Sequence, residues 1–418
     1  MNSKFPQQKL ASIAKVYSGF AFHSRDMQPG GDIPILKISN IQDKRVTQDC
    51  SSGLPAAANS RRFDKFRLRA GDVLVAMTGE RSVGKLGRMR KIDREYLVNQ
   101  RVAIIRPLPD QGDPDYLFHV LTMEKYEKTL SSYGLGAGQP NINPVQIASL
   151  MLPLPPLGIQ RKIGSILTGF EDLIENNNER IRILESLAQS IYRKWFVDFR
   201  FPRRGKLTWV ESPLGKIPKG WRVGTLGELI QFQTGSSIKP DPKGAYALYG
   251  SNGLIGKSSG FQFERGMIIG RVGNYCGSVQ YSHSAFCASG NTVIALPLEG
   301  KDELIPYLYY TLKHLSLGQL ASGSAQPQIT QSVLKSQPVL IPPVSFLKKF
   351  CSVTFELLRQ IDHLKKENEN LHKTRELLLP ELISGRLDLE RVERKASSTR
   401  SREYPQHKNP RFDLNSLI

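Results

Sequence analysis

The chain has 418 residues, of which 58 are Lys or Arg and 38 are Asp or Glu, so its formal net charge is +20. This length predicts two to four domains, and the positive charge favours a polyanionic partner, nucleic acid ahead of a membrane surface. No run approaches the roughly 18 apolar residues of a membrane span, and the start, MNSKFPQQKL, lacks an apolar signal stretch, so we expect neither a span nor secretion.

Cysteine and histidine usage points to the cytoplasm and away from metal chemistry. The four cysteines are widely spaced, at Cys50, Cys276, Cys287 and Cys351, and form no C-x-x-C pair. They predict reduced thiols in a reducing cytoplasm. The histidines show no metal-ligand spacing, and no residues form an acid–base constellation. We therefore expect no metal site and no catalytic residue in this chain.

Residues 1–156 are predicted to form a first globular domain, domain 1, in which basic residues gather between positions 61 and 94. Lys and Arg contacts to phosphate dominate the affinity of proteins for DNA. For each such residue taken alone, a solvated surface charge is the alternative. The candidates that we favour for DNA contact are Arg61, Arg62, Lys85, Arg88 and Lys91.

One stretch of domain 1 resembles a nucleotide-binding loop but departs from it at a decisive position. Residues 79–85 fit the pattern G-x-x-x-x-G-K, yet Leu86 follows where that loop carries Ser or Thr for magnesium. The sequence after Leu86 has the pattern of strand and turn rather than of an amphipathic helix. We interpret the stretch as a basic glycine turn between two strands.

Residues 157–198 are predicted to form a long helix. Its seam advances in alternating steps of four and three residues, the 3.5-residue period of a coiled coil. The seam positions are Ile163, Leu167, Phe170, Ile174, Asn177, Ile181, Leu184, Ala188, Ile191 and Trp195. Residues 199–221, rich in Pro, Gly and Lys, are predicted to be a linker.

The rest of the chain contains a second domain, a second helix and a tail. We predict domain 2 over residues 222–343, with Lys239, Lys257 and Arg271 as candidate DNA contacts, and a helix with a matching seam over 344–386. The final segment, 387–418, is polar and basic. We predict that it is disordered and binds DNA weakly, with a docking peptide for a partner as the alternative.

The second half of the chain repeats the first. Residues 137–156, AGQPNINPVQIASLMLPLPP, align without a gap with residues 324–343, SAQPQITQSVLKSQPVLIPP, at a constant offset of 187. Gln139 and Gln326 occupy equivalent positions, which predicts a shared role in contacting DNA or in fixing a loop. Duplication of this kind indicates one scaffold used twice.

Looser matches extend the repeat towards the start of each domain. The segment 71–74 aligns with 266–269, and 102–105 aligns with 292–295. The predicted fold class is therefore α+β. Two mixed α/β domains are joined by two long helices that form an antiparallel coiled coil, with an approximate two-fold axis relating the copies.

Each helix seam contains one asparagine. Full antiparallel overlap of the two helices sets Asn177 opposite Asn368, and a buried asparagine pair fixes register at some cost in stability. The alternative is that both face solvent or a third helix. The seam from 163 to 195 is roughly 50 Å long at about 1.5 Å per residue. A spacer of that length suits two domains that bind DNA about one helical turn apart, roughly 34–36 Å.

Several stretches together resemble the specificity subunit of type I restriction–modification systems. They lie between residues 10 and 387, and their order and duplication carry the resemblance more than any single motif. In chain order they are SGFAFHS, IPILKISNI, LRAGDVLVAMTGERSVGKLG, GQPNI, LPLPPLGIQRKI, IYRKWFVDF, SPLGKIPKGWRVGTLGEL, YGSNGLIG and RELLLPELISGRL.

The resemblance implies that each domain reads one half of a split, asymmetric sequence in double-stranded DNA, and that the chain itself is not an enzyme. It implies two modification subunits with S-adenosylmethionine, two restriction subunits with ATP and Mg, and no cofactor in this chain. The two helices would set the spacing and dock the modification subunits. The residues that we assign to docking are Ile163, Phe170, Ile174, Ile181, Phe350, Leu357, Ile361 and Leu371. A stand-alone bivalent DNA-binding regulator without enzyme partners is the alternative.

Overall fold

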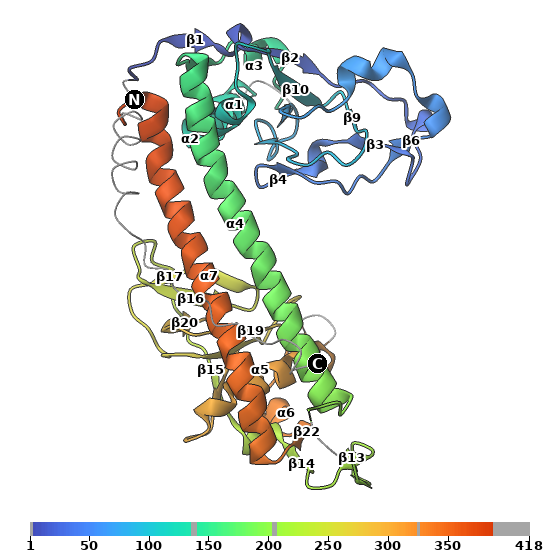
Figure 1. The fold of residues 1–418 in the computed structure, drawn as a ribbon, viewed down its shortest axis with the longest axis vertical. Helices are drawn as coiled ribbons and strands as arrows, with labels where there is room; N and C mark the ends of the chain where they lie inside the picture. The colour runs from blue at the N-terminus through green and yellow to red at the C-terminus, as the bar shows by residue number, and fades with distance from the viewer. Residues whose placement is uncertain (1–2, 135–139, 203–206, 324–326, 388–418) are drawn as a thin grey trace. The chain divides into compact units, whose positions relative to one another are not determined.

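The computed structural model describes residues 3–134, 140–202, 207–323 and 327–387. The chain divides into two compact units, each of which combines one globular domain with a segment of each long helix (Figure 1). Among the described residues, unit 1 runs to Glu175 and resumes at Asn368, and unit 2 runs from Asn176 to Glu367.

Domain 1 is built on a four-stranded antiparallel sheet with the order β2-β10-β7-β8. Side chains alternate between the two faces of a strand. Val73 and Val75 accordingly pack with helix residues such as Tyr116, whereas Leu74 and Ala76 join a separate core. Both faces of the central strand β7 are therefore buried. The strands are β2 (Ala14–Ser18), β10 (Val102–Pro107), β7 (Val73–Ala76) and β8 (Leu86–Gly87).

Smaller elements complete domain 1. Its described residues include the α-helices α1 (Pro114–Leu121), α2 (Glu124–Tyr133) and α3 (Pro144–Ala148). The other strands are β1 (Gln7–Lys9), β3 (Ile33–Leu36), β4 (Ile41–Gln42), β5 (Arg45–Val46), β6 (Gly53–Leu54), β9 (Leu97–Val98) and β11 (Met151–Pro153). Strands β4 and β5 are joined through Asp43 and Lys44, which both have positive φ, as a two-residue hairpin turn of type I′ requires.

Domain 2 repeats the main sheets of domain 1 with the same strand order. Its four-stranded sheet has the order β15-β21-β18-β19, and the three-stranded sheet β17-β16-β20 corresponds to β6-β3-β9 of domain 1, with one parallel pair in each. The strands of these sheets are β15 (Ile230–Thr234), β21 (Thr292–Pro297), β18 (Gly266–Gly270), β19 (Val279–Ser282), β17 (Gly253–Ser258), β16 (Tyr246–Gly250) and β20 (Phe286–Ala288). Domain 2 also contains β14 (Arg222–Thr225), β22 (Pro338–Ile341), α5 (Ile305–His314) and α6 (Gln331–Lys335). Within residues 199–221, predicted as a linker, β12 (Trp209–Val210) pairs with β13 (Ile217–Pro218).

The shared topology confirms the internal repeat and corrects one detail of its alignment. Val73 pairs with Ile105 in domain 1, and Met267 pairs with Ala295 in domain 2. Val73 is therefore equivalent to Met267, whereas the sequence alignment matched it with Ile268. Both strands are buried along their whole length. The alternation of polar and apolar residues that fixes register in half-exposed strands is therefore missing.

The two long helices, α4 (Leu157–Tyr192) and α7 (Val344–Ser384), run antiparallel within unit 1 (Figure 1). Ile163, near the start of α4, shares a core with Leu382, near the end of α7. Further along α4, Glu171 lies 3.6 Å from Arg375. Residue numbers therefore increase along α4 while those of the contacting residues on α7 decrease, as in an antiparallel pair. Gly385 ends α7 with a φ of +72°, the left-handed conformation that stops a helix.

The same antiparallel relation holds within unit 2, which confirms the predicted coiled coil. Asn177 Nδ2 donates a hydrogen bond of 3.3 Å to Glu367, and the ring centre of Tyr192 lies 6.1 Å from that of Phe350. Asn368 is buried, as is Asn177. Their direct pairing remains a prediction. Helix α4 continues into a π-helical turn, η6 (Arg193–Val197).

Candidate DNA and subunit interfaces

Arg61 and Arg62 are exposed on a short 3-10 helix of domain 1, η5 (Arg61–Phe66). The hydroxyl of Ser60 caps this helix by accepting a hydrogen bond from the backbone N–H of Arg62, and Phe63 is buried beneath it. The Arg62 guanidinium lies 4.6 Å from the centre of the Phe63 ring. The backbone of this turn is thus anchored, while two charged heads remain in solvent, free to meet a phosphate.

Lys85 and Lys91 are also exposed. Lys85 ends the turn between β7 and β8, and its carbonyl accepts a hydrogen bond of 2.8 Å from the N–H of Ala76. Gly79 and Gly84 both adopt positive φ within this turn. The interpretation of residues 79–85 as a glycine turn between strands is confirmed, and no amphipathic helix follows it.

In domain 2, Lys239 and Lys257 are exposed, the latter on β17. Arg271 is half-buried, and its Nη1 donates a hydrogen bond of 3.2 Å to the carbonyl of Gly290. Part of the hydrogen-bonding capacity of its guanidinium is therefore used within the domain. Gln139 and Gln326 lie outside the described residues, as does the tail from residue 388.

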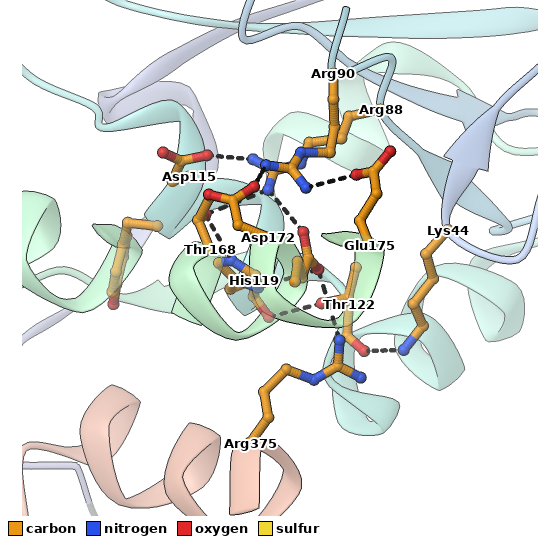
Figure 2. Close-up of polar contacts among 12 residues, drawn as sticks. Lys44, Arg88, Arg90, Asp115, His119, Thr122, Thr168, Asp172, Glu175 and Arg375 are labelled. Atoms are coloured by element: carbon orange, nitrogen blue, oxygen red, sulfur yellow. Dashed lines mark hydrogen bonds and ion pairs between the residues drawn. The ribbon is translucent and has the colours of Figure 1, made fainter. Parts of the chain in front are cut away.

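Arg88 is a correction to the predicted DNA-contacting set. Its side chain is buried rather than exposed to solvent. It donates to Asp115 (Figure 2) and, over 2.9 Å, to Glu171 on α4. Its guanidinium lies 4.2 Å from the centre of the Phe118 ring. Thr168 accepts a further hydrogen bond of 3.3 Å. With these partners the Arg88 guanidinium is committed to the helix and is not available to DNA phosphate.

Arg90 belongs to the same polar network. It pairs with Asp172 and, at 3.0 Å, with Glu175, both on α4 (Figure 2). From the other helix, Arg375 approaches Glu171 at 3.6 Å. Arg375 thus joins α7 to the same carboxylate that holds Arg88.

His119 is buried in this network and is held neutral. Its Nε2 lies 3.1 Å from Thr168 Oγ1. Burial lowers the pKa of His119 to about 3, and the charges of Arg88 and Arg375 act in the same direction. Glu171 lies 3.9 Å from Nδ1, but its charge is already compensated by these two arginines. The imidazole therefore serves as a neutral hydrogen-bonding group.

The residues assigned to subunit docking require a second correction. Ile163, Ile174, Ile181, Phe350 and Ile361 are buried, because the seam packs within the chain itself. Their side chains have no surface left to offer to a partner. Phe170, Leu357 and Leu371 are partly buried.

The apolar side chains that both helices do expose lie off the seam. Leu173 has 54% of its surface exposed and Leu377 has 73%. In unit 1 the set is Ile166, Leu173 and Leu377, and in unit 2 it is Ile183, Leu187, Val344 and Phe355.

The sequence analysis missed the carboxylates that meet Arg88 and Arg90. Glu171, Asp172 and Glu175 lie at helical spacings i, i+1 and i+4, which places them along one side of α4. An acidic row on a predicted helix, together with a basic cluster near a predicted strand, could have indicated an internal network of ion pairs. A basic cluster by itself does not reveal whether its partner is phosphate or carboxylate.

The described residues contain neither a metal-binding cluster nor a helix able to span a membrane. No group of three or more His, Cys, Asp or Glu side chains among them is arranged to hold a metal ion. In the same part of the chain, no helix has both the length and the apolar character that crossing a membrane demands.

The family model for the type I restriction modification DNA specificity domain matches residues 2–186 and 218–373. The chain belongs to this family. Its two matched regions each contain one of the topologically equivalent domains, which confirms the resemblance drawn from the sequence. The α+β fold class, with two repeated domains and long coiled-coil helices, is confirmed as well.

Similar proteins carry related names. The type I restriction enzyme MjaIX specificity subunit of Methanocaldococcus jannaschii is 26% identical over 306 residues, which cover 66% of this chain and 69% of the relative. The type I restriction enzyme EcoprrI specificity subunit of Escherichia coli is 28% identical over 366 residues, covering 79% and 83%. These comparisons give no support to a stand-alone regulator.

A solved structure has the same fold. It is the crystal structure of a type I restriction–modification system S subunit from M. genitalium, which superposes with a TM-score of 0.60 at 19% identity. The match covers 91% of this chain and 96% of the other. The architecture of two domains and two long helices is therefore shared at low sequence identity.

Proposed function

We propose that this chain is the DNA-recognition subunit of a type I restriction–modification complex, in which each domain reads one half of a split, asymmetric sequence. One observation carries the proposal. The two family-matched regions have the same strand order, and each packs on its own segment of the helix pair. A duplicated scaffold whose loops differ is suited to two different half-sites held at a fixed separation.

The exposed basic residues are the proposed contacts to the DNA backbone. In domain 1 they are Arg61, Arg62, Lys85 and Lys91, and in domain 2 they are Lys239, Lys257 and the half-buried Arg271. The net charge of +20 provides the long-range attraction that phosphate binding requires. Gln139 and Gln326 remain proposed contacts or loop anchors.

The exposed apolar residues of the two helices are the proposed docking sites for modification subunits. Leu173 and Leu377 in unit 1, and Phe355 in unit 2, have surface that a partner would remove from water. Catalysis, S-adenosylmethionine and ATP with Mg are proposed to lie on the partner subunits. In this arrangement the chain binds and positions, and its partners carry out the chemistry.

Mapping methylated adenines tests the recognition step. The full chain is expressed with its modification subunits in a host that lacks them, and methylated positions are mapped across the genome. We expect one motif made of two different specific blocks separated by a fixed unspecified spacer. A single uninterrupted motif, or the same motif in the absence of this chain, would contradict the proposal.

Charge reversal tests the proposed DNA contacts. The double variant Arg61→Glu, Arg62→Glu should weaken DNA binding by about tenfold to a hundredfold at low salt, because each neutralised phosphate contributes to affinity through counterion release. The slope of binding affinity against salt concentration should also become shallower. Lys128→Glu is the matched control, since Lys128 is an exposed cation of domain 1 paired with Glu124 on the same helix. Equal losses in both proteins would remove Arg61 and Arg62 from the interface.

A further inference from the structure

Two arginines of domain 1 reach the same row of carboxylates on α4. Arg88 and Arg90 follow strand β8 and are separated by one residue, so their side chains leave the chain on the same side. Arg88 meets Glu171, and Arg90 meets Asp172 and Glu175 (Figure 2). Domain 1 is therefore attached to one helix at two successive points.

The two contact points differ in burial and in partners. Arg88 is buried, stacks on Phe118 and also pairs with Asp115 of domain 1, so it ties the domain core to the helix. Arg90 is partly exposed, with 27% of its side-chain surface open to solvent, and its partners are on α4. Arg88 supplies the anchor, and Arg90 supplies a second point that opposes rotation about that anchor.

The second helix is tied into the same site. Arg375 of α7 lies 3.6 Å from the Glu171 carboxylate that also receives Arg88. Lys44, on the β4–β5 hairpin, donates a hydrogen bond of 2.9 Å to the carbonyl of Thr122, at the end of α1 (Figure 2). The charge-assisted hydrogen bonds of Arg88 and Arg90 to the α4 carboxylates are directional, because the guanidinium has a planar and fixed donor geometry. The network therefore restrains the angle of domain 1 on the helices as well as holding it there.

We propose that Arg88 and Arg90 are positioning residues that hold domain 1 at one angle on α4, and so fix the length of the spacer between the two DNA half-sites. This inference rests on the proposed function. Neither residue needs to touch DNA to do this. The helix length sets a coarse separation, and the network sets the angle from which domain 1 reaches its half-site.

A small change of angle is sufficient to alter the spacing. A domain of this size provides a lever of roughly 30 Å, and one base pair of DNA advances by about 3.4 Å. A tilt of about 6–7° at the attachment therefore moves the far side of domain 1 by one base pair, by the same arithmetic. Together with the shared apolar core, two ion-pair points on one helix oppose a rotation of this size more strongly than a single point does.

Arg90→Glu tests the proposal, because Arg90 is partly exposed and its change leaves the buried Arg88 in place. The full complex with modification subunits methylates a host genome, and methylation is compared between sites with the wild-type spacer and sites one base pair longer or shorter. We expect the preference for the wild-type spacer to fall by roughly fivefold, which corresponds to about 1 kcal/mol. The two half-site sequences should be unchanged.

Two further proteins complete the experiment. Lys128→Glu, which reverses an exposed charge elsewhere in domain 1, should keep the wild-type spacer preference. Adding Asp172→Arg to Arg90→Glu restores an opposite-charge pair and should recover part of the preference. If Arg90→Glu gives no methylation, the milder Arg90→Gln is judged by the same criterion.

The outcomes separate this inference from the proposed function. A merely structural role predicts lower methylation at every site with the spacer preference intact, and that result would overturn the inference. An unchanged spacer preference at full activity would overturn it equally. If the wild-type complex shows no two-part motif at all, the proposed function fails first.

Discussion

Domain 1 and domain 2 attach to the helices through the same structural position but with different chemistry. The paired strands make Arg88 and Arg90 equivalent to Tyr281 and His283, because β8 and β19 occupy the same place in the two sheets. Tyr281 packs against His283 with ring centres 4.2 Å apart, and against Tyr309 at 5.9 Å. Domain 2 thus places aromatic rings where domain 1 places guanidinium groups.

The helix residues that face this contact also differ between the two units. Under the repeat offset of 187, Glu171 corresponds to Leu358, which is buried in the core of unit 2. Glu175 corresponds to Asp362, which is close enough to His283 to affect its pKa. Burial lowers the pKa of His283, and Asp362 opposes that shift. One scaffold therefore accepts a directional ionic attachment in one copy and a mainly apolar one in the other.

The largest expected loss of stability comes from truncating the first buried seam residue of each helix, which is Ile163 in unit 1 and Phe350 in unit 2. Phe350 packs against Phe196 and Trp195, with ring centres 4.8 and 5.9 Å apart. Phe350→Ala should lower the free energy of unfolding of unit 2 by about 3–5 kcal/mol, and Ile163→Ala should lower that of unit 1 by about 2–4 kcal/mol. Hydrogen exchange, followed separately in α5 and in α1, measures the two losses.

Each variant is the control for the other, because both remove a fully buried side chain at equivalent positions. The loss in each should be confined to its own unit. A smaller loss for Phe350→Ala than for Ile163→Ala would contradict the view that unit 2 depends more on aromatic packing.

The sequence predicted the helices, their direction and the repeat because these depend on periodic patterns. The 3.5-residue seam indicated α4 and α7, and the offset of 187 indicated a second domain with the same scaffold. The alignment of β7 with β18 was wrong by one residue because a strand buried on both faces has no polar face to mark its phase. Local pattern was sufficient wherever one face of an element differed from the other.

The site was predicted less well because it depends on which surfaces meet in three dimensions. Arg88 and Arg61 are both basic residues in one cluster, but only the tertiary fold buries Arg88 against Glu171. Five of the eight predicted docking residues were misassigned for a related reason, because they are buried. A seam residue such as Ile163 packs between two helices of the same chain, so its side chain is buried and cannot contact a partner subunit. Candidate docking residues are then those left exposed, such as Leu173.

A fall in pH should weaken the ionic attachment through its buried histidine, His119. The pKa of His119 is lowered by burial to about 3, so between about 6.5 and 3 the unfolded chain takes up a proton that the folded chain does not. The contribution of His119 to stability is therefore lost as pH falls. The loss in unit 1 should be up to about 1.4 kcal/mol per pH unit, or about 2 kcal/mol from pH 6.5 to pH 5.

His119→Gln removes the titrating group and tests this expectation. Hydrogen exchange in α1 at pH 7.5 and pH 5, corrected for the intrinsic rate, should show a smaller fall in stability for the variant than for the wild type. The equivalent residue in unit 2 is Tyr310, whose pKa is raised by burial, so α5 should show no corresponding difference. An equal fall in both proteins would mean that His119 does not contribute.

The smallest expected effect is at the hydroxyl of Tyr281. No hydrogen bond from this hydroxyl is found among the described residues, whereas its ring contacts His283 and Tyr309. Tyr281→Phe should therefore change the stability of unit 2 by less than about 0.5 kcal/mol, while Tyr281→Ala should lower it by about 2 kcal/mol, since the ring is only partly buried. Hydrogen exchange in β19 measures both. A loss above about 1 kcal/mol for Tyr281→Phe would show that domain 2 also depends on a polar contact at this position. The contrast between an ionic and an aromatic attachment would then be wrong, because both domains would be held by directional hydrogen bonds.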